Sequence, residues 1–266
     1  MNRIDAIFSE LRAQGRRALM PFVCAGRPAP GRLAELLEEL ERSGASIVEI
    51  GFAFSDPIAD GPVIAAAMHK ALEAGTTPTG TLREIEAARG RVRCGLVGML
   101  SVSIVQRLGG PGGFCRSAAG AGLDGLIVPD APLEEAEALG AAAREAGLTF
   151  SLLVSPTTPE ERVGLICAAC SGFVYLLARA GVTGERAEAP QVAGAVRRLR
   201  QVTDLPIACG FGITTAEHVR EVVRHADAAI VGSALARRME EAAGSGSDAI
   251  AGAGALVREL ATGLAV

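Results

Sequence analysis

The sequence is poor in aromatic residues, clustered positive charge and long apolar runs. Aromatic residues make up 3% of the 266 residues, and 26 basic residues face 30 acidic ones, for a formal charge of −4. Without a basic cluster interleaved with aromatic residues, the chain is not expected to bind nucleic acid. No apolar run of about 18 residues is free of a charge or a helix breaker, so no membrane span is expected. The 33 glycines follow no three-residue period, which excludes a collagen-like chain.

The six cysteines lack the spacing of a disulfide framework, and most lie within apolar runs. Cys167 and Cys170 form a CxxC, but they fall late in an expected helix rather than at a strand-to-helix turn, which disfavours a redox role. The other cysteines are Cys24, Cys94, Cys115 and Cys209. Residues 1–17 carry acidic groups and are predicted as an amphipathic helix rather than a secretory signal. We therefore expect a cytoplasmic protein with free thiols.

One pattern repeats along the chain: a short apolar run, a loop containing Gly, Pro or Asp, and a helical stretch. Strands are predicted at Ala18–Val23, Ile47–Gly51, Cys94–Met99, Gly125–Pro129, Thr149–Val154, Gly172–Leu177, Pro206–Cys209 and Ala228–Val231. Helices are predicted at Asn2–Gln14, Pro30–Ser43, Pro62–Ala74, Gly80–Arg89, Gly113–Ala121, Leu133–Ala146, Pro159–Ala169, Gln191–Val202, Thr215–His225, Ala234–Ala242 and Asp248–Leu264. No second domain is evident, so we expect a single domain over residues 1–266.

Eight such units in about 250 residues are typical of an α/β fold, the (β/α)8 or TIM barrel. The strand runs are apolar on both faces, which indicates parallel strands buried between a core and covering helices. The alternative is a doubly wound sheet, which usually carries a GxGxxG turn after its first strand. Residues 24–30 lack that turn. We predict a barrel with an extra N-terminal helix and an active site at the C-terminal ends of its strands.

Glu49 lies in the middle of the second predicted strand, between Val48 and Ile50. Strand alternation places it on the opposite face from these two neighbours. A buried ionisable group is costly unless it is paired or functional. If Glu49 points into the barrel mouth, we expect a raised pKa and an ability to give and take a proton near neutral pH. A structural carboxylate paired with an arginine is an equally open interpretation.

Two aspartates lie in the loop after the second strand, which reads Phe54-Ser-Asp-Pro-Ile-Ala-Asp-Gly-Pro62. Pro62 suits the first position of a helix, so Asp56 and Asp60 can be interpreted as turn and cap residues. Loops that follow barrel strands nevertheless carry function more often than other loops do. Both interpretations stay open at this point.

Glycines recur after the last three predicted strands, in residues 181–184, 210–213 and 232–234. Loops in this part of a barrel often bind phosphate through backbone N–H groups and a helix N-terminus. Ser233 adds a hydroxyl to the third of these stretches. The three stretches together predict a phosphate site.

A phosphate-binding barrel suggests carbon–carbon cleavage of a sugar phosphate, and the residue counts restrict how this could occur. A Schiff-base aldolase needs a lysine at a strand end, but the chain has a single lysine, Lys70, in the middle of an expected helix. Zinc-dependent aldolases need clustered histidines. His69, His218 and His225 all fall in helices expected on the solvated outside. The remaining option is a pair of carboxylates that transfer protons on a substrate that can itself take up the electron pair of the broken bond.

Six segments taken in chain order resemble the tryptophan synthase alpha subunit family: Val48–Gly51, Phe54–Pro62, Gly125–Asp130, Tyr175–Gly184, Gly210–Ile213 and Val231–Ala234. The resemblance covers nearly the whole chain. It implies a (β/α)8 barrel that cleaves indole-3-glycerol phosphate to indole and glyceraldehyde 3-phosphate, without a metal or cofactor of its own. It also implies a partner, a pyridoxal-phosphate-dependent beta subunit that consumes the indole within an alpha-beta-beta-alpha tetramer.

The resemblance also implies roles for individual residues. Glu49 matches the group that protonates C3 of the indole ring and deprotonates the glycerol hydroxyl, and Asp60 matches the carboxylate that stabilises or accepts the indole N–H proton. Tyr175 matches a residue near the substrate. The expected walls of the indole pocket are Phe22, Leu100 and Phe211, and the expected phosphate contacts are Gly184, Gly212, Gly232 and Ser233.

Two segments depart from the family pattern. The loop after the third strand begins Leu100-Ser-Val-Ser where the family has Tyr-x-Asn-Pro, and Gly26-Arg27-Pro28 replaces Gly-Asp-Pro. In the family, the loop after the third strand contacts the beta subunit. The sequence therefore leaves two alternatives to the alpha subunit: a stand-alone indole-3-glycerol phosphate lyase that releases free indole, and a non-catalytic paralogue.

Overall fold

The strands form one parallel sheet that curls into a barrel. The computed structural model describes residues 1–57, 60–179 and 189–265. The strands are β1 (Ala18–Cys24), β2 (Ile47–Gly51), β3 (Gly95–Met99), β4 (Gly125–Ile127), β5 (Thr149–Ser151), β6 (Leu153–Val154), β7 (Val174–Leu177), β8 (Ile207–Gly210) and β9 (Ala228–Val231). Their order is β5-β4-β3-β2-β1-β9-β8-β7-β6. The two ends of this order, β5 and β6, are separated in the chain by Leu152 alone, so the sheet closes on itself.

The predicted barrel is confirmed, with one difference in the fifth strand. The predicted strand Thr149–Val154 is divided at Leu152 into β5, which pairs with β4, and β6, which pairs with β7. The Leu152 carbonyl still accepts a hydrogen bond from the N–H of Tyr175, at 3.1 Å. The eight predicted strands therefore correspond to the nine observed ones, because one strand changes neighbours halfway along its length.

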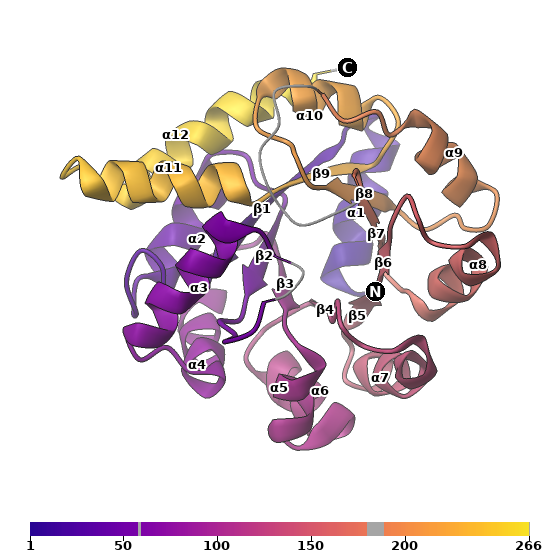
Figure 1. Cartoon of the computed structure of the whole chain (residues 1–266), viewed down its shortest axis with the longest axis horizontal. Coiled ribbons are helices and arrows are strands. Elements are labelled where there is room, and N and C mark those ends of the chain that lie inside the picture. Colours follow the sequence, from indigo (N-terminus) through magenta and orange to yellow (C-terminus); the bar gives the residue numbers. More distant parts are fainter. Residues whose placement is uncertain (58–59, 180–188, 266) are drawn as a thin grey trace.

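Most of the helices surround the barrel on its outside, whereas the first of them lies across one end of it (Figure 1). They are α1 (Arg3–Ala13), α2 (Leu33–Arg42), α3 (Pro62–Glu73), α4 (Pro78–Arg89), α5 (Val102–Arg107), α6 (Gly110–Gly120), α7 (Leu133–Glu145), α8 (Glu160–Ala169), α9 (Ala193–Arg200), α10 (Ala216–Val223), α11 (Ser233–Gly244) and α12 (Ala249–Ala261), followed by a 3₁₀ turn, η1 (Thr262–Leu264). None of the helices in the described ranges is long and apolar enough to cross a membrane.

Helix α5 was not predicted, because its first turn depends on a contact with another loop. Ser101 caps the helix by accepting the N–H of Ser103 at 3.1 Å. Asp130, in the loop after β4, accepts the Ser101 hydroxyl at 2.6 Å and the N–H of Val102 at 2.8 Å. A helix of six residues has little stability of its own. Tertiary hydrogen bonds therefore support it where local sequence does not.

Alternation along the strands separates an inner core from an outer one. Side chains such as Met20, Ile47 and Ile230 fill the barrel interior. Side chains at the alternate positions of the same strands point outward and pack under the helices. Helix α1 closes the N-terminal end of the barrel with Ile4 and Phe8, which belong to the inner cluster. The barrel therefore opens only toward the C-terminal ends of its strands.

Two ion pairs hold α1 against the barrel. Arg3 pairs with Asp124 at 3.2 Å and Arg12 with Asp227 at 3.0 Å. Each aspartate lies directly before a strand, and each also accepts a backbone N–H from the neighbouring strand, at 2.9 and 2.8 Å. Hydrogen bonds of this kind satisfy nearly buried carboxylates. They fix the closed end and leave the opposite end to form the site.

Candidate active site

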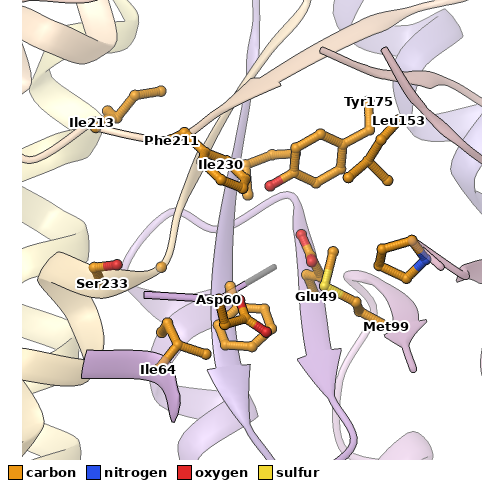
Figure 2. Close-up of a pocket in the computed structure, with 14 residues that line it drawn as sticks. Glu49, Asp60, Ile64, Met99, Leu153, Tyr175, Phe211, Ile213, Ile230 and Ser233 are labelled. Carbon is orange, nitrogen blue, oxygen red and sulfur yellow. The ribbon is translucent and has the colours of Figure 1, made fainter. Parts of the chain in front are cut away.

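A pocket lies at the C-terminal mouth of the barrel and gathers most of the predicted site residues (Figure 2). The space within it amounts to about 640 Å³ when the open solvent at its mouth is counted. The predicted residues that line it are Phe22, Glu49, Asp60, Tyr175, Phe211, Gly212, Gly232 and Ser233. Residues that sequence reasoning missed also line it: Ile64, Met99, Pro129, Leu153, Ile213 and Ile230. Several of these, such as Met99 and Ile230, are inward-facing residues near the ends of strands. The alternation of side chains along each strand could have identified them.

Glu49 is buried at the inner face of β2. It is 1% exposed and lies in register with Phe22 of β1 and Val97 of β3. Its Oε2 atom is buried and has no hydrogen-bond partner in the described part of the chain. Burial, and then the nearby charge of Asp60, raises the pKa of Glu49 to about 8. No ion pair found within the described residues involves Glu49, so the geometry does not support an arginine-paired structural carboxylate.

Asp60 lines the same pocket from the loop that precedes α3. Gly61, rather than Asp60, occupies the N-cap position of α3, and no side chain caps this helix. The interpretation of Asp60 as a helix cap is therefore wrong, because Gly61 adopts the extended backbone conformation that the cap requires. Burial raises the pKa of Asp60 to about 6. Asp56 does not line this pocket, but it lines a neighbouring hollow together with Asp60.

Aromatic side chains form one wall of the pocket. The rings of Tyr175 and Phe211 meet edge to face, with centroids 6.5 Å apart and an interplanar angle of 87°. Glycine at position 210 makes this possible, because a Cβ there would lie 2.4 Å from the Tyr175 hydroxyl. The Tyr175 hydroxyl and the Glu49 carboxyl point toward the same space (Figure 2). Burial holds the pKa of Tyr175 well above its usual range, so its hydroxyl stays protonated.

Two predicted residues are not among those that line the pocket. Leu100 follows Met99, which faces the barrel interior, so alternation turns Leu100 toward the outer core. Leu100 lines an adjacent hollow with Phe54 and Asp56, and this hollow shares Asp60 and Met99 with the pocket. Gly184 lies outside the described residues.

A set of backbone donors faces the pocket opposite the carboxylates. Helix α11 begins at Ser233, and its N-cap, Gly232, provides no side-chain hydrogen bond, so the first N–H groups of the helix have no acceptor among the described residues. In the described part of the chain, the N–H groups of Gly212 and Ile213 also have no acceptor. No lysine or arginine is among the described lining residues. Unfilled N–H groups at a helix start suit a phosphate or another anion.

The expectation of solvated histidines holds for two of the three. The side chains of His69 and His225 are 73% and 38% exposed. His218 is only 5% exposed, so the expectation is wrong for this residue. Its position in α10 faces the barrel rather than solvent, and its ring packs behind the turn that carries Gly212.

Residues 8–264 match the family model described as the tryptophan synthase alpha chain. The chain belongs to the tryptophan synthase alpha chain family. It is 47% identical over 237 residues to the tryptophan synthase alpha chain of Synechococcus sp. (strain CC9902), covering 88% of each chain. It is 44% identical over 262 residues to that of Chloroflexus aggregans, covering 98% of this chain and 97% of the relative.

Solved structures of tryptophan synthase have the same fold. Superposition on tryptophan synthase of Mycobacterium tuberculosis gives a TM-score of 0.90 at 34% identity, covering 100% of this chain and 99% of the other. The alpha subunit of Legionella pneumophila gives 0.91 at 32% identity, covering 99% and 98%. Members of the tryptophan synthase alpha chain family are lyases of tryptophan biosynthesis that cleave indole-3-glycerol phosphate.

Replacing the buried carboxyl of Glu49 should stabilise the protein at alkaline pH. The folded chain keeps a proton on Glu49 that the unfolded chain releases from about pH 4.5 upward, so stability falls between the ordinary pKa of 4.5 and the folded value of about 8. We therefore expect the unfolding free energy of Glu49→Gln, measured relative to the wild type, to be about 4–5 kcal/mol higher at pH 9 than at pH 4.

Chemical denaturation at the two pH values measures this difference. Glu86→Gln, at an exposed position of α4, is the matched control and should show almost no difference between them. Equal behaviour of Glu49→Gln and Glu86→Gln would contradict the raised pKa.

Proposed function

We propose that this pocket cleaves indole-3-glycerol phosphate to indole and glyceraldehyde 3-phosphate, with Glu49 as the acid and base of the reaction. The observation that carries the proposal is the buried Oε2 of Glu49, which lies in the pocket without a hydrogen-bond partner among the described residues. A buried polar atom left without a partner requires an explanation. A substrate that exchanges a proton with Glu49 supplies one.

The raised pKa allows Glu49 to begin the reaction as an acid. With a pKa of about 8, the carboxyl is mostly protonated at neutral pH and donates its proton to C3 of the indole ring. The product is an indolenine cation. Glu49, now a carboxylate, takes the proton of the glycerol hydroxyl next to the ring. The carbon–carbon bond then breaks, its electron pair restores the indole, and the hydroxyl carbon becomes the aldehyde of glyceraldehyde 3-phosphate.

Asp60 complements Glu49 because its environment gives it the opposite protonation state at neutral pH. With a pKa of about 6, its carboxyl is mostly ionised there. A carboxylate that accepts the indole N–H stabilises the positive charge of the protonated ring. Two carboxyl groups whose surroundings separate their pKa values can act as acid and base in one site.

The rest of the pocket fits the two ends of this substrate. The phosphate would accept the N–H groups at the start of α11 and of the Gly212–Ile213 turn, together with the Ser233 hydroxyl. The indole would lie among the apolar side chains, with Phe22 and Tyr175 as aromatic walls. We also retain Gly184 as a phosphate contact. Leu100 lines the adjacent hollow that shares Asp60 and Met99 with the pocket, and we retain it as an indole contact from that side.

We further propose that the chain acts with a beta subunit in an alpha-beta-beta-alpha tetramer, and that it acts in the cytoplasm. A solved structure that resembles this chain is that of tryptophan synthase from Mycobacterium tuberculosis. The loop after β3 retains an ordered form through Ser101 and Asp130, despite its departure from the family pattern. The free, buried cysteines among the described residues suit a reducing compartment. No observation favours the stand-alone lyase or the non-catalytic paralogue.

The proposed roles predict a bell-shaped pH dependence of kcat/KM for indole formation. Activity should fall below about pH 6, as Asp60 takes up a proton, and above about pH 8, as free Glu49 loses its own. Glu49→Gln should lower kcat by about 10²–10⁴-fold, because an amide cannot transfer the proton. Asp60→Asn should lower activity and remove the acidic limb.

Steady-state assays of indole release across this pH range test both assignments. Glu84→Gln is the matched control, because Glu84 also has a buried oxygen without a partner among the described residues but lies on α4, away from the pocket. Near wild-type turnover of Glu49→Gln would refute the proposed function.

Binding of a beta subunit should stimulate cleavage through the loops at the barrel mouth. A coupling of about 1–3 kcal/mol corresponds to a 5–150-fold change in affinity between substrate and partner. Calorimetric titration of the beta subunit, with and without glycerol 3-phosphate, measures it. Asp56→Asn should weaken partner binding, whereas Asp204→Asn, an exposed position before β8, should not. Full activity alone with no heat of binding would favour the stand-alone lyase.

A further inference from the structure

His218 lies behind the turn that leads from β8 into α10. The side chain belongs to α10, one turn after its N-cap Thr215, and it is almost completely buried. Its Nδ1 atom lies 3.2 Å from the carbonyl oxygen of Gly212 and 3.2 Å from the Thr214 hydroxyl. His218 is not among the residues that line the pocket, but Gly212 is. Among the described residues, the ring reaches the site through the backbone of Gly212.

The turn has an unusual backbone conformation that requires support. Phe211 has φ of 82° and Gly212 has φ of 78°, and Phe211 is the single non-glycine residue with positive φ in the described ranges. A bulky side chain in this conformation costs free energy and persists where its surroundings hold it. The Tyr175 ring contacts Phe211 on one side. His218 holds the next peptide unit on the other.

The direction of the Gly212 carbonyl fixes the direction of the following N–H. In a trans peptide, the C=O of one residue and the N–H of the next point in opposite directions. The Gly212 carbonyl points back to His218, away from the pocket, so the N–H of Ile213 points the opposite way. That N–H has no acceptor in the part of the chain that the structure describes. It is a donor ready for an anion in the pocket.

We propose that His218 is a positioning residue for the substrate phosphate: its Nδ1–H holds the Gly212 carbonyl, and this contact keeps the Ile213 N–H directed at the phosphate. The proposal rests on the proposed function, because it assumes that the phosphate binds beside α11. His218 does not touch the substrate itself. It acts by removing the freedom of the Gly212–Ile213 peptide to rotate, which a turn of two positive-φ residues would otherwise retain.

The proposal specifies the tautomer of the ring. A neutral imidazole donates from one nitrogen and accepts at the other. If Nδ1 carries a lone pair, it accepts from the Thr214 N–H at 3.4 Å and from the Thr214 hydroxyl at 3.2 Å, but it faces the Gly212 carbonyl oxygen, another acceptor, at 3.2 Å. If Nδ1 carries the proton, the Gly212 carbonyl and the Thr214 hydroxyl both serve as acceptors, and the Thr214 N–H loses its acceptor on the ring. The proposal requires the second arrangement, with the proton on Nδ1.

Two substitutions separate the hydrogen bond from packing. In His218→Asn the amide nitrogen takes the place of Nδ1 and can donate to Gly212. In His218→Leu the side chain fills the space without a donor. Titration calorimetry with glycerol 3-phosphate should show affinity weakened about 5–10-fold in His218→Leu, with most of it restored in His218→Asn. Indole binding should stay unchanged in both variants. In His218→Leu, kcat/KM should fall because KM rises, while kcat stays close to the wild-type value.

The control is His225→Leu, just after α10, where the ring is partly exposed and close to Glu221 alone among the described ion-pair partners. Wild-type affinity for glycerol 3-phosphate in His218→Leu would overturn the proposal. So would an equal loss of indole and glycerol 3-phosphate binding, which indicates a general structural role. Failure of the wild type to bind glycerol 3-phosphate would instead refute the phosphate site of the proposed function.

Nuclear magnetic resonance of the full chain gives a second, independent test if His218→Leu fails to fold. The chain has three histidines, so ¹⁵N-labelled imidazole signals can be assigned by comparison with His218→Asn and His225→Leu. We expect His218 to show the Nδ1–H tautomer. The Nε2–H tautomer would overturn the proposal, because the Gly212 carbonyl would then have no donor in the ring.

Discussion

The burial of one carboxyl group without a partner is the constraint on which the site depends. An ionised carboxylate in an apolar interior is costly, so the group keeps its proton instead. Glu49 is held in this state by the inner face of β2 and by neighbouring strands that place Phe22 and Val97 in register with it. A proton retained at neutral pH is what acid catalysis needs. The apolar barrel interior thus contributes directly to the chemistry and is not only a scaffold.

The closed end of the barrel makes this environment possible. Helix α1 fills the N-terminal end with apolar side chains, and its pairs with Asp124 and Asp227 hold it there. The site lies at the opposite end, where the two carboxyl groups and the first N–H groups of α11 line the same pocket. Charge at one wall and donors at the other orient a substrate that has an apolar ring and a phosphate. The carboxyl groups and the N–H groups are positioned in the same way, because all of them lie at or after the C-terminal ends of parallel strands.

Strand periodicity was sufficient to predict the barrel and to place Glu49 on the opposite face from Val48 and Ile50. Which of the two faces points inward was left open by the sequence. Leu100 shows the limit of matching by motif alone: alternation turns it outward, one residue beyond Met99. Helix α5 and the burial of His218 depend on contacts between segments distant in sequence, such as Asp130 with Val102. Neither composition nor local periodicity contains that information. The proposed phosphate site could be predicted in part. Its glycines mark the turns in the sequence, but tertiary contacts such as that of His218 with Gly212 orient the peptide groups.

The protonation state of Glu49 tests the account most directly. Side-chain ¹³C-glutamate labelling with NMR detection follows each carboxyl through its titration, and Glu49→Gln identifies the signal that belongs to Glu49. The account predicts a carboxyl that is mostly protonated at pH 7 in the free enzyme, with a midpoint near the value of about 8 that burial and Asp60 produce. A midpoint close to the ordinary glutamate value of about 4.3 would contradict it, because Glu49 would then have no proton to donate.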